Sequence, residues 1–459
     1  MKKYTTDFTV GNVSPALVKF ATPLFLTSLL QVFYSMVDMI IVGQVMGDVG
    51  LSAVSVGCDV TNLLAFIAMG FAAAGQVIIS QLIGSGKRDK LPGFIGTMCS
   101  FLTLAAIAFT VIGFFTRDLM LIVMNTPEEA YAEALGYSTV CIFGMVFIYG
   151  YNAASAILRG MGDAKRPLLF IGISSVVNVI LDIIFVVILN TGATGAATAT
   201  VISQAASLIL CIIFIYKKRE RYGLEFHRSD FLIVREHFVR LIKLGIPMAI
   251  KFAAIQTSRL FVNSFVNSYG VTISAFSGVA NKINSVSNLI SNAFNTAGST
   301  MVAQNIGAKK YERVPKILYT VGGITCTIAT IFTVTILAFP SAVYGIFTSD
   351  TAVIEVGYTY LPVAVFIFFG SSLRAIANAL INGTGNTTMN FATAILDGIV
   401  LRIGLSLLFG LALNMQAFGF WLGDALAGLT PFVIGIFYYL SGRWKRGADH
   451  KTEDTEEAI

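Results

Sequence analysis

The chain has 459 residues, of which 56% are hydrophobic and only 12% are charged, and its mean hydropathy is +0.78. A soluble domain carries roughly 25% charged residues, so no soluble fold of this size could bury so much apolar side chain and still cover its own surface. The composition therefore excludes an ordinary soluble protein and indicates a protein of the lipid bilayer. The five cysteines lie in apolar stretches without a CxxC pair, which predicts packing residues and no structural disulfide.

Twelve apolar stretches follow one another along the chain, and each is long enough to cross a bilayer of about 30 Å. They lie at 14–42, 51–83, 91–115, 131–158, 167–189, 192–216, 241–268, 273–306, 314–338, 354–381, 390–412 and 416–440. The start of the chain has no short apolar core followed by a small-residue cleavage site, so we expect the first helix to remain in the mature protein. The sequence thus predicts an all-α integral membrane protein with about twelve transmembrane helices.

The basic residues are distributed unevenly over the segments between these stretches. With the amino terminus inside, 24 of the 31 lysines and arginines fall in inside segments, and the outside loops hold only Arg117. Short cytoplasmic loops of membrane proteins carry such an excess of positive charge. The net charge of +6 therefore predicts an orientation, with both termini cytoplasmic, and no nucleic-acid partner.

A shift of 223 residues brings the two halves of the chain into register. The segment Gln81–Pro92 matches Gln304–Pro315, Gly75 matches Gly298, and the Gly-x-Gly pair at 160 matches the pair at 383. With a slip of one residue, Pro23 matches Pro247. Six spans in each half predict two bundles of the same orientation, a parallel repeat typical of transporters, although a duplicated bundle without transport is the alternative.

The repeat also predicts the domain organisation. We expect an N-terminal six-helix bundle at 1–216, a basic cytoplasmic linker at 217–243, a C-terminal six-helix bundle at 244–442 and a disordered cytoplasmic tail at 443–459. Because one chain already supplies both halves of a substrate pathway, we expect a monomer.

Ionisable residues inside the spans are the candidate functional residues, since a carboxylate at mid-bilayer costs roughly 2.5–3.5 kcal/mol on insertion scales. Gln31, Tyr34 and Asp38 share one helical face in the first span, and Asn178 and Asp182 share a face in the fifth. We expect these two polar faces to meet away from lipid. A carboxylate pair in a low dielectric can take up and release a proton, and the same oxygens would suit a sodium ion. The alternative is a hydrogen-bonded packing cluster.

The second half does not repeat this acidic cluster. Val262 lies near the position that matches Asp38, and the cations inside the spans of the second half are Lys251, Arg259, Lys282, Arg374 and Arg402. Some of these cations are expected to reach the surface or to pair with Asp397. We expect Lys251, Gln256 and Arg374 to line the substrate cavity, which puts coupling chemistry in the first half and substrate contact in the second.

The first span ending in Val-Asp38-Met-Ile-Ile-Val-Gly43, the Gly75…Gln81-x-x-Gly84 segment and its copy Gly298…Gln304-x-x-Gly307 resemble multidrug and toxic compound extrusion (MATE) transporters. The resemblance covers about residues 14–440. It implies two six-helix bundles forming a V in a prokaryotic cell (inner) membrane. It also implies export of cationic or amphipathic drugs by alternating access against a proton or sodium gradient, without a cofactor.

Within that family the first-half cluster is similar to the DinF-like prokaryotic branch. Carried over by spacing, the ion-coupling positions are Gln31, Tyr34, Asp38, Asn152, Asn178, Asp182 and Thr200. The chain departs from the branch that has an acidic residue on the seventh helix, because Lys251 and Gln256 occupy that region. This departure argues against a sodium site in the second half and leaves proton or sodium open at Asp38 and Asp182.

Other classes of protein fit the sequence less well. The three histidines (His227, His237 and His450) lack metal-ligand spacing, and the Gly383 turn lacks the lysine of a phosphate loop, so we expect no enzyme and an ion gradient as the energy source. The main alternative is a flippase of lipid-linked oligosaccharide or peptidoglycan precursors from the same superfamily. A channel or passive scaffold is the third class.

Overall fold

The computed structural model describes residues 5–445, and every regular element within them is a helix. The α-helices are α1 (Val13–Gly84), α2 (Leu91–Val123), α3 (Glu128–Phe143), α4 (Met145–Gly160), α5 (Lys165–Asp182), α6 (Gly192–Tyr222), α7 (Arg235–Asn267), α8 (Val271–Gly307), α9 (Val314–Ala338), α10 (Pro340–Gly345), α11 (Thr351–Thr384), α12 (Thr387–Ile395), α13 (Leu401–Leu407), α14 (Gln416–Ala427) and α15 (Thr430–Leu440). The π-helices are η2 (Ile183–Ile188), η5 (Leu396–Val400) and η6 (Leu408–Ala412), and the 3-10 helices are η1 (Arg88–Lys90), η3 (Arg228–Phe231), η4 (Tyr311–Arg313) and η7 (Arg443–Lys445).

Helix α1 contains the first two predicted spans. Its 72 residues would measure about 108 Å as one straight helix, more than three times the thickness of a bilayer core. The break is at Gly47, where φ is 61° and ψ is −147°, a backbone conformation that costs little only in glycine.

The remaining helices agree with the predicted class. Eight helices are long and apolar enough to cross a membrane, and the pair α3 and α4, bent by 49°, makes a ninth. Helices α7 and α8, with 33 and 37 residues, are also long enough but carry more polar side chains. With α1 counted twice, the described residues make the twelve passes of the predicted all-α membrane fold.

The chain forms two compact units. Among the described residues, unit 1 contains 5–7 and Leu26–Ala249, and unit 2 contains Phe8–Phe25 and 250–445. Each crossing between units lies two residues after a proline inside a helix, Pro23 in α1 and Pro247 in α7. Proline removes a helical hydrogen bond and kinks the helix, so each long helix contributes its two ends to different units.

The N-terminal segment is fastened within unit 2 by its backbone. The amide of Phe8 donates to Oε1 of Gln304 at 2.9 Å, and Asn305 Nδ2 donates to the carbonyl of Phe8 at 3.2 Å. Arg313 Nη2 donates to the carbonyl of Gly11 at 2.9 Å, and the Phe8 side chain is buried. These contacts satisfy backbone groups that a free terminus would leave to water.

The segment between α6 and α7 is fastened within unit 1 in a similar way. Ser100 Oγ donates to the carbonyl of Phe231 at 2.6 Å, and Arg240 Nη2 donates to Gln81 Oε1 at 2.9 Å. A side chain at Gly96 would overlap the carbonyl of Asp230. Gln81 and Gln304 match in the repeat. Gln304 therefore binds the N-terminal segment in unit 2 as Gln81 binds the segment between α6 and α7 in unit 1.

A surface ion pair also ties this segment to unit 1. Lys90 Nζ lies 3.1 Å from Glu236 Oε1. The hydrogen bond from Lys90 lowers the pKa of Glu236, and partial burial lowers the pKa of the neighbouring His237. Residues 217–222 and 235–243 of the predicted linker continue α6 and α7 as helix. Of the predicted tail, 443–445 form η7, and 446–459 lie outside the described residues.

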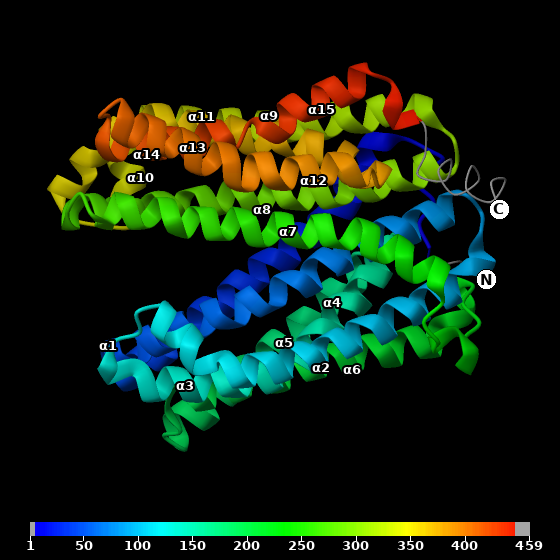
Figure 1. The fold of residues 1–459 in the computed structure, drawn as a ribbon, viewed down its shortest axis with the longest axis horizontal. Helices are drawn as coiled ribbons and strands as arrows, with labels where there is room; N and C mark the ends of the chain where they lie inside the picture. The colour runs from blue at the N-terminus through cyan, green and yellow to red at the C-terminus, as the bar shows by residue number, and fades with distance from the viewer. Residues whose placement is uncertain (1–4, 446–459) are drawn as a thin grey trace. The chain divides into compact units, whose positions relative to one another are not determined.

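The predicted repeat is visible in the packing. A Cβ atom added to Gly160 would lie 2.9 Å from the carbonyl oxygen of Gln76, and one added to Gly383 would lie 2.8 Å from that of Ser299. Gly160 and Gly383 are 223 residues apart, and so are Gln76 and Ser299, so the same close helix contact occurs in each unit. Close approach of helices through glycine is the usual way to pack helices in lipid. Figure 1 shows the helices of each unit as a bundle.

Candidate functional site

Two carboxyl groups, from Asp38 on α1 and Asp182 on α5, meet in the interior of unit 1. Asp38 is 5% exposed and Asp182 is fully buried. The two groups lie within hydrogen-bonding reach of each other. Asp182 is the last residue of α5 and directly precedes the π-helix η2, and π segments are frequent at functional sites.

The pair is unusual in having no cationic partner. Within residues 5–445 no ion pair reaches either carboxyl group. A carboxylate only accepts hydrogen bonds, so the two groups can bond to each other only when one of them carries a proton. Without that proton, Asp38 Oδ1 and both oxygens of Asp182 have no hydrogen-bond partner among the described residues.

Neutral polar side chains surround a small cavity beside the carboxyl pair. Its volume of about 10 Å³ is close to the minimum for one water molecule. Its polar lining consists of Tyr34, Ser174, Ser175, Asn178, Thr200, Ser203 and Gln204. Asn178 Nδ2 donates to Thr200 Oγ1 at 3.5 Å, and Tyr34 lies within hydrogen-bonding reach of Gln204. Tyr34, Asp38, Asn178, Asp182 and Thr200 are therefore brought together.

Two other predicted coupling residues make no hydrogen bond to this cluster within the described residues. Gln31 is half-buried and has no hydrogen bond to the described residues, and Asn152 Nδ2 donates to the carbonyl of Ile148 at 2.9 Å in its own helix. Sequence reasoning missed Gln204, although its spacing of four residues from Thr200 places both on one face of α6.

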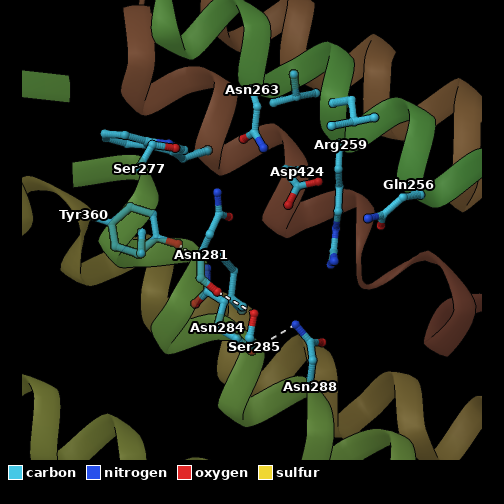
Figure 2. A pocket seen from close by; sticks show the side chains of 15 residues that line it. Gln256, Arg259, Asn263, Ser277, Asn281, Asn284, Ser285, Asn288, Tyr360 and Asp424 are labelled. Carbon is cyan, nitrogen blue, oxygen red and sulfur yellow. Dashed lines mark hydrogen bonds between the residues drawn. The ribbon is translucent and has the colours of Figure 1, made fainter. Parts of the chain in front are cut away.

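A larger cavity of about 210 Å³ lies within unit 2. Figure 2 shows Arg259 of α7 extending between Gln256 and Asp424 toward a row of polar side chains on α8. The row consists of Ser277, Asn281, Asn284 and Asn288, which follow i, i+4, i+7 and i+11 spacing. That spacing was the signal available in the sequence, because it gives α8 one continuous polar face.

The three predicted cavity residues have different positions. Gln256 lines the unit 2 cavity, whereas Lys251 and Arg374 are not among its lining residues. Lys251 Nζ donates to Asn378 Oδ1 at 2.6 Å, and Arg374 Nε donates to the carbonyl of Gly428 at 3.3 Å.

A buried ion network lies beside this cavity. Arg402 is fully buried, donates through Nη2 to Asp397 Oδ1 at 2.8 Å, and donates through Nη1 to Asp424 Oδ1. Asp397 lies in the π-helix η5. Unit 2 therefore pairs its carboxylates with a cation, in contrast to the acidic pair of unit 1.

The fold and these sites define a class: a multi-pass helical membrane protein built as a parallel repeat, with buried ionisable groups in both repeats. The MatE family model matches residues 23–184 and again 247–408. The two matches cover most of the chain and are offset by 224 residues, so they coincide with the internal repeat. The chain belongs to the MatE family of membrane transporters, and the predicted family resemblance is confirmed.

Several relatives match over nearly their whole length. The chain is 29% identical to the "Probable multidrug resistance protein YpnP" of Bacillus subtilis over 97% of this chain and 98% of the relative. It is 22% identical to the "Probable multidrug resistance protein NorM" of Thermotoga maritima over 99% and 98%.

Solved structures match the fold. A MOP superfamily transporter from Pyrococcus furiosus, whose description reads "Reverse polarity of binding pocket suggests different function", superposes with a TM-score of 0.89 at 21% identity, over 97% of this chain and 99% of that one. An outward-facing multidrug resistance MATE family transporter superposes with a TM-score of 0.86 at 22% identity, over 95% and 97%.

Proposed function

We propose that this protein exports cationic or amphipathic organic molecules across a prokaryotic cell membrane by antiport, with Asp38 and Asp182 as the ion-coupling pair. Membership of the MatE family and the multidrug resistance names of its relatives support the transport class. The uneven distribution of basic residues supports cytoplasmic termini. The transporter acts as a monomer.

The observation that carries the coupling proposal is the contact between two buried carboxyl groups without a cation. The pair forms a hydrogen bond when it holds one proton, and loss of that proton leaves two negative charges in a low dielectric. A conformation that admits water to the pair stabilises the charged form, and one that excludes water stabilises the protonated form. Proton occupancy therefore changes the relative free energies of two conformations, which is what antiport requires.

A sodium ion is the alternative coupling ion at the same oxygens. The unpartnered oxygens of Asp38, Asn178 and Asp182 are acceptors that sodium would also use. We favour the proton because a single proton both supplies the hydrogen bond between the two carboxyl groups and removes one of their two charges.

The test is efflux of ethidium from proteoliposomes under imposed proton and sodium gradients, applied separately. We expect efflux driven by the proton gradient in the wild-type protein and its loss in Asp38→Asn. The matched control is Asp59→Asn, which makes the same change in the same helix at an exposed side chain without an ion pair in the described residues. Efflux driven only by the sodium gradient would make sodium, and not the proton, the coupling ion. Unchanged efflux in Asp38→Asn would contradict the assignment of the coupling site.

A flippase of lipid-linked precursors is the second candidate function. The observation that favours it is the cationic character of the unit 2 cavity, where Arg259 would face a phosphate. Movement of a fluorescent lipid-linked substrate across vesicles, with no ethidium efflux under either gradient, would support this candidate over drug export.

A further inference from the structure

The unit 2 cavity contains a guanidinium group, that of Arg259, without a hydrogen-bond partner among residues 5–445. Arg259 lines the cavity and makes no hydrogen bond or ion pair within the described residues. The carboxylate that shares the cavity, Asp424, is already paired with Arg402, which also binds Asp397. Asp424 also attracts Arg259 through its charge, but no described residue accepts a hydrogen bond from Arg259, so its N–H groups remain available to a ligand.

The uncharged groups around Arg259 include further unused hydrogen-bonding atoms. Trp421 lines the cavity and is only 8% exposed, yet its indole N–H has no acceptor among residues 5–445. Asn284 donates to the Tyr360 hydroxyl at 2.7 Å, whereas its Oδ1 is buried without a partner. A buried polar atom without a partner costs roughly 1–3 kcal/mol, so such atoms at a cavity wall indicate that a ligand or water completes them.

The charge around the cavity has one sign in excess. Four cationic side chains and two carboxylates interact in this part of unit 2: Lys251, Arg259, Arg374 and Arg402 with Asp397 and Asp424. The difference is a net charge of +2 around the cavity. An anion is the ligand that offsets such an excess, and guanidinium and N–H donors are the groups that bind carboxylate and phosphate oxygens.

We propose that the unit 2 cavity binds the anionic end, a carboxylate or phosphate group, of a small or amphipathic molecule, with Arg259 as the ion-pairing residue. The indole of Trp421 and the amides of Gln256, Asn263 and Asn281 supply hydrogen bonds to that group and to polar atoms next to it. This inference rests on the proposed function, because it names a chemical class of substrate for the same transporter.

The size of the cavity agrees with one end of a larger ligand. A volume of about 210 Å³ is roughly seven times the share of a water molecule in the liquid. Drug-sized ligands occupy about 300–1,000 Å³, so the remainder of an amphipathic molecule would lie outside the polar cavity. A zwitterionic amphiphile fits this arrangement and the proposed function together, because its anionic end would bind Arg259 and its cationic end would lie outside this cavity.

The two tryptophans of the chain make the site directly observable. The sequence contains only Trp421 and Trp444. Trp444 of η7 stacks on Tyr439 of α15 and does not line the cavity. In a Trp444→Phe background, the fluorescence of Trp421 reports on this cavity alone. We would titrate the full-length protein in detergent with 4-bromobenzoate, whose bromine quenches indole fluorescence, and with the matched cation 4-bromobenzylammonium.

We expect saturable quenching by the anion and at least about tenfold weaker quenching by the cation. Arg259→Gln should weaken the anion's affinity at least about tenfold, which corresponds to about 1.4 kcal/mol, and Arg259→Lys should restore part of it. The matched control is Lys282→Gln, which removes an exposed cation next to Asn281 that does not line the cavity, and its affinity should not change. Equal quenching by the two probes, or unchanged affinity in a folded Arg259→Gln protein, overturns the proposal.

A second arm identifies the source of the anion. In nanodiscs whose lipids have brominated acyl chains, stronger Trp421 quenching by phosphatidylglycerol than by phosphatidylcholine, lost in Arg259→Gln, would assign the site to a lipid headgroup. Quenching by 4-bromobenzoate alone would assign it to a soluble acid, and quenching by neither overturns the proposal. Because these measurements need no gradient, binding without driven efflux would contradict only the proposed function, and efflux without binding would contradict only this inference.

Discussion

Removal of the Arg402 side chain should destabilise unit 2 more than any change at an exposed charge. Arg402 is fully buried and holds Asp397 and Asp424 at the same time. Arg402→Met keeps an apolar stem of similar length but leaves two carboxylates in the interior without their cation. Breaking a buried ion pair from one side costs about 3–5 kcal/mol, because the remaining charge loses its partner and recovers no water.

Thermal unfolding in detergent, followed by the retention of the native gel-filtration peak, measures this loss. For a unit of some 200 residues, each kcal/mol corresponds to roughly 2–4 °C, so we expect a fall of roughly 6–20 °C. The control is the triple variant Asp397→Leu, Arg402→Met and Asp424→Leu, which removes the whole network. Its stability should return close to that of the wild-type protein, since an apolar replacement of a buried ion network is often neutral.

The comparison between the single and triple variants decides the reasoning. If Arg402→Met lowers the unfolding temperature by only a degree or two, the carboxylates have access to water and the network is not desolvated. If the triple variant is as unstable as the single one, then the loss comes from packing around Arg402 and not from unpaired charge.

Three further predictions concern backbone and surface. Gly96→Leu should detach the segment between α6 and α7 from the rest of unit 1, because the new side chain would overlap the carbonyl of Asp230. Faster proteolysis of this segment would show the detachment, and an unchanged cleavage rate would contradict it. Gly47→Ala should destabilise the protein by about 1–3 kcal/mol through the positive φ alone, since nothing lies within 4 Å of the added Cβ. The control is Gly323→Ala in a regular helix, where the added Cβ also has no neighbour within 4 Å, and it should stabilise the protein by about 0.5–1 kcal/mol. Equal effects of the two substitutions in thermal unfolding would rule out backbone strain at Gly47. Because Lys90 lowers the pKa of Glu236 in the folded state, their ion pair stabilises the protein above the unfolded pKa of Glu236, and this contribution disappears as the pH falls through the folded pKa. Glu236→Gln should therefore lower the free energy of unfolding by under about 1 kcal/mol at pH 7, given the exposure of the pair, and should have no effect in strong acid. A constant difference in stability at every pH would contradict this linkage.

Much of the site was predictable where the signal is local. Asp38 and Asp182 stand out in the sequence because a carboxylate in an apolar stretch is costly wherever the helix lies. The pairing of their two helices followed from the polar faces at Tyr34 and Asn178, since lipid leaves such faces no other partner. The polar row on α8 was equally visible as a spacing, but its relation to Arg259 was not, because α7 and α8 meet only in the folded unit.

The sequence by itself determined the membrane class, the twelve passes, the repeat and the acidic pair, because hydropathy and spacing act over one helix at a time. Only the tertiary structure decided which segments belong to which unit. The crossings after Pro23 and Pro247 depend on where two long helices kink and on which helices receive their ends. The tertiary structure also decided which cations are paired: Arg402 and Arg259 look alike in the sequence, but among the described residues Arg402 forms ion pairs with two carboxylates and Arg259 forms none. Pairing between distant helices depends on packing geometry, and no local pattern encodes it.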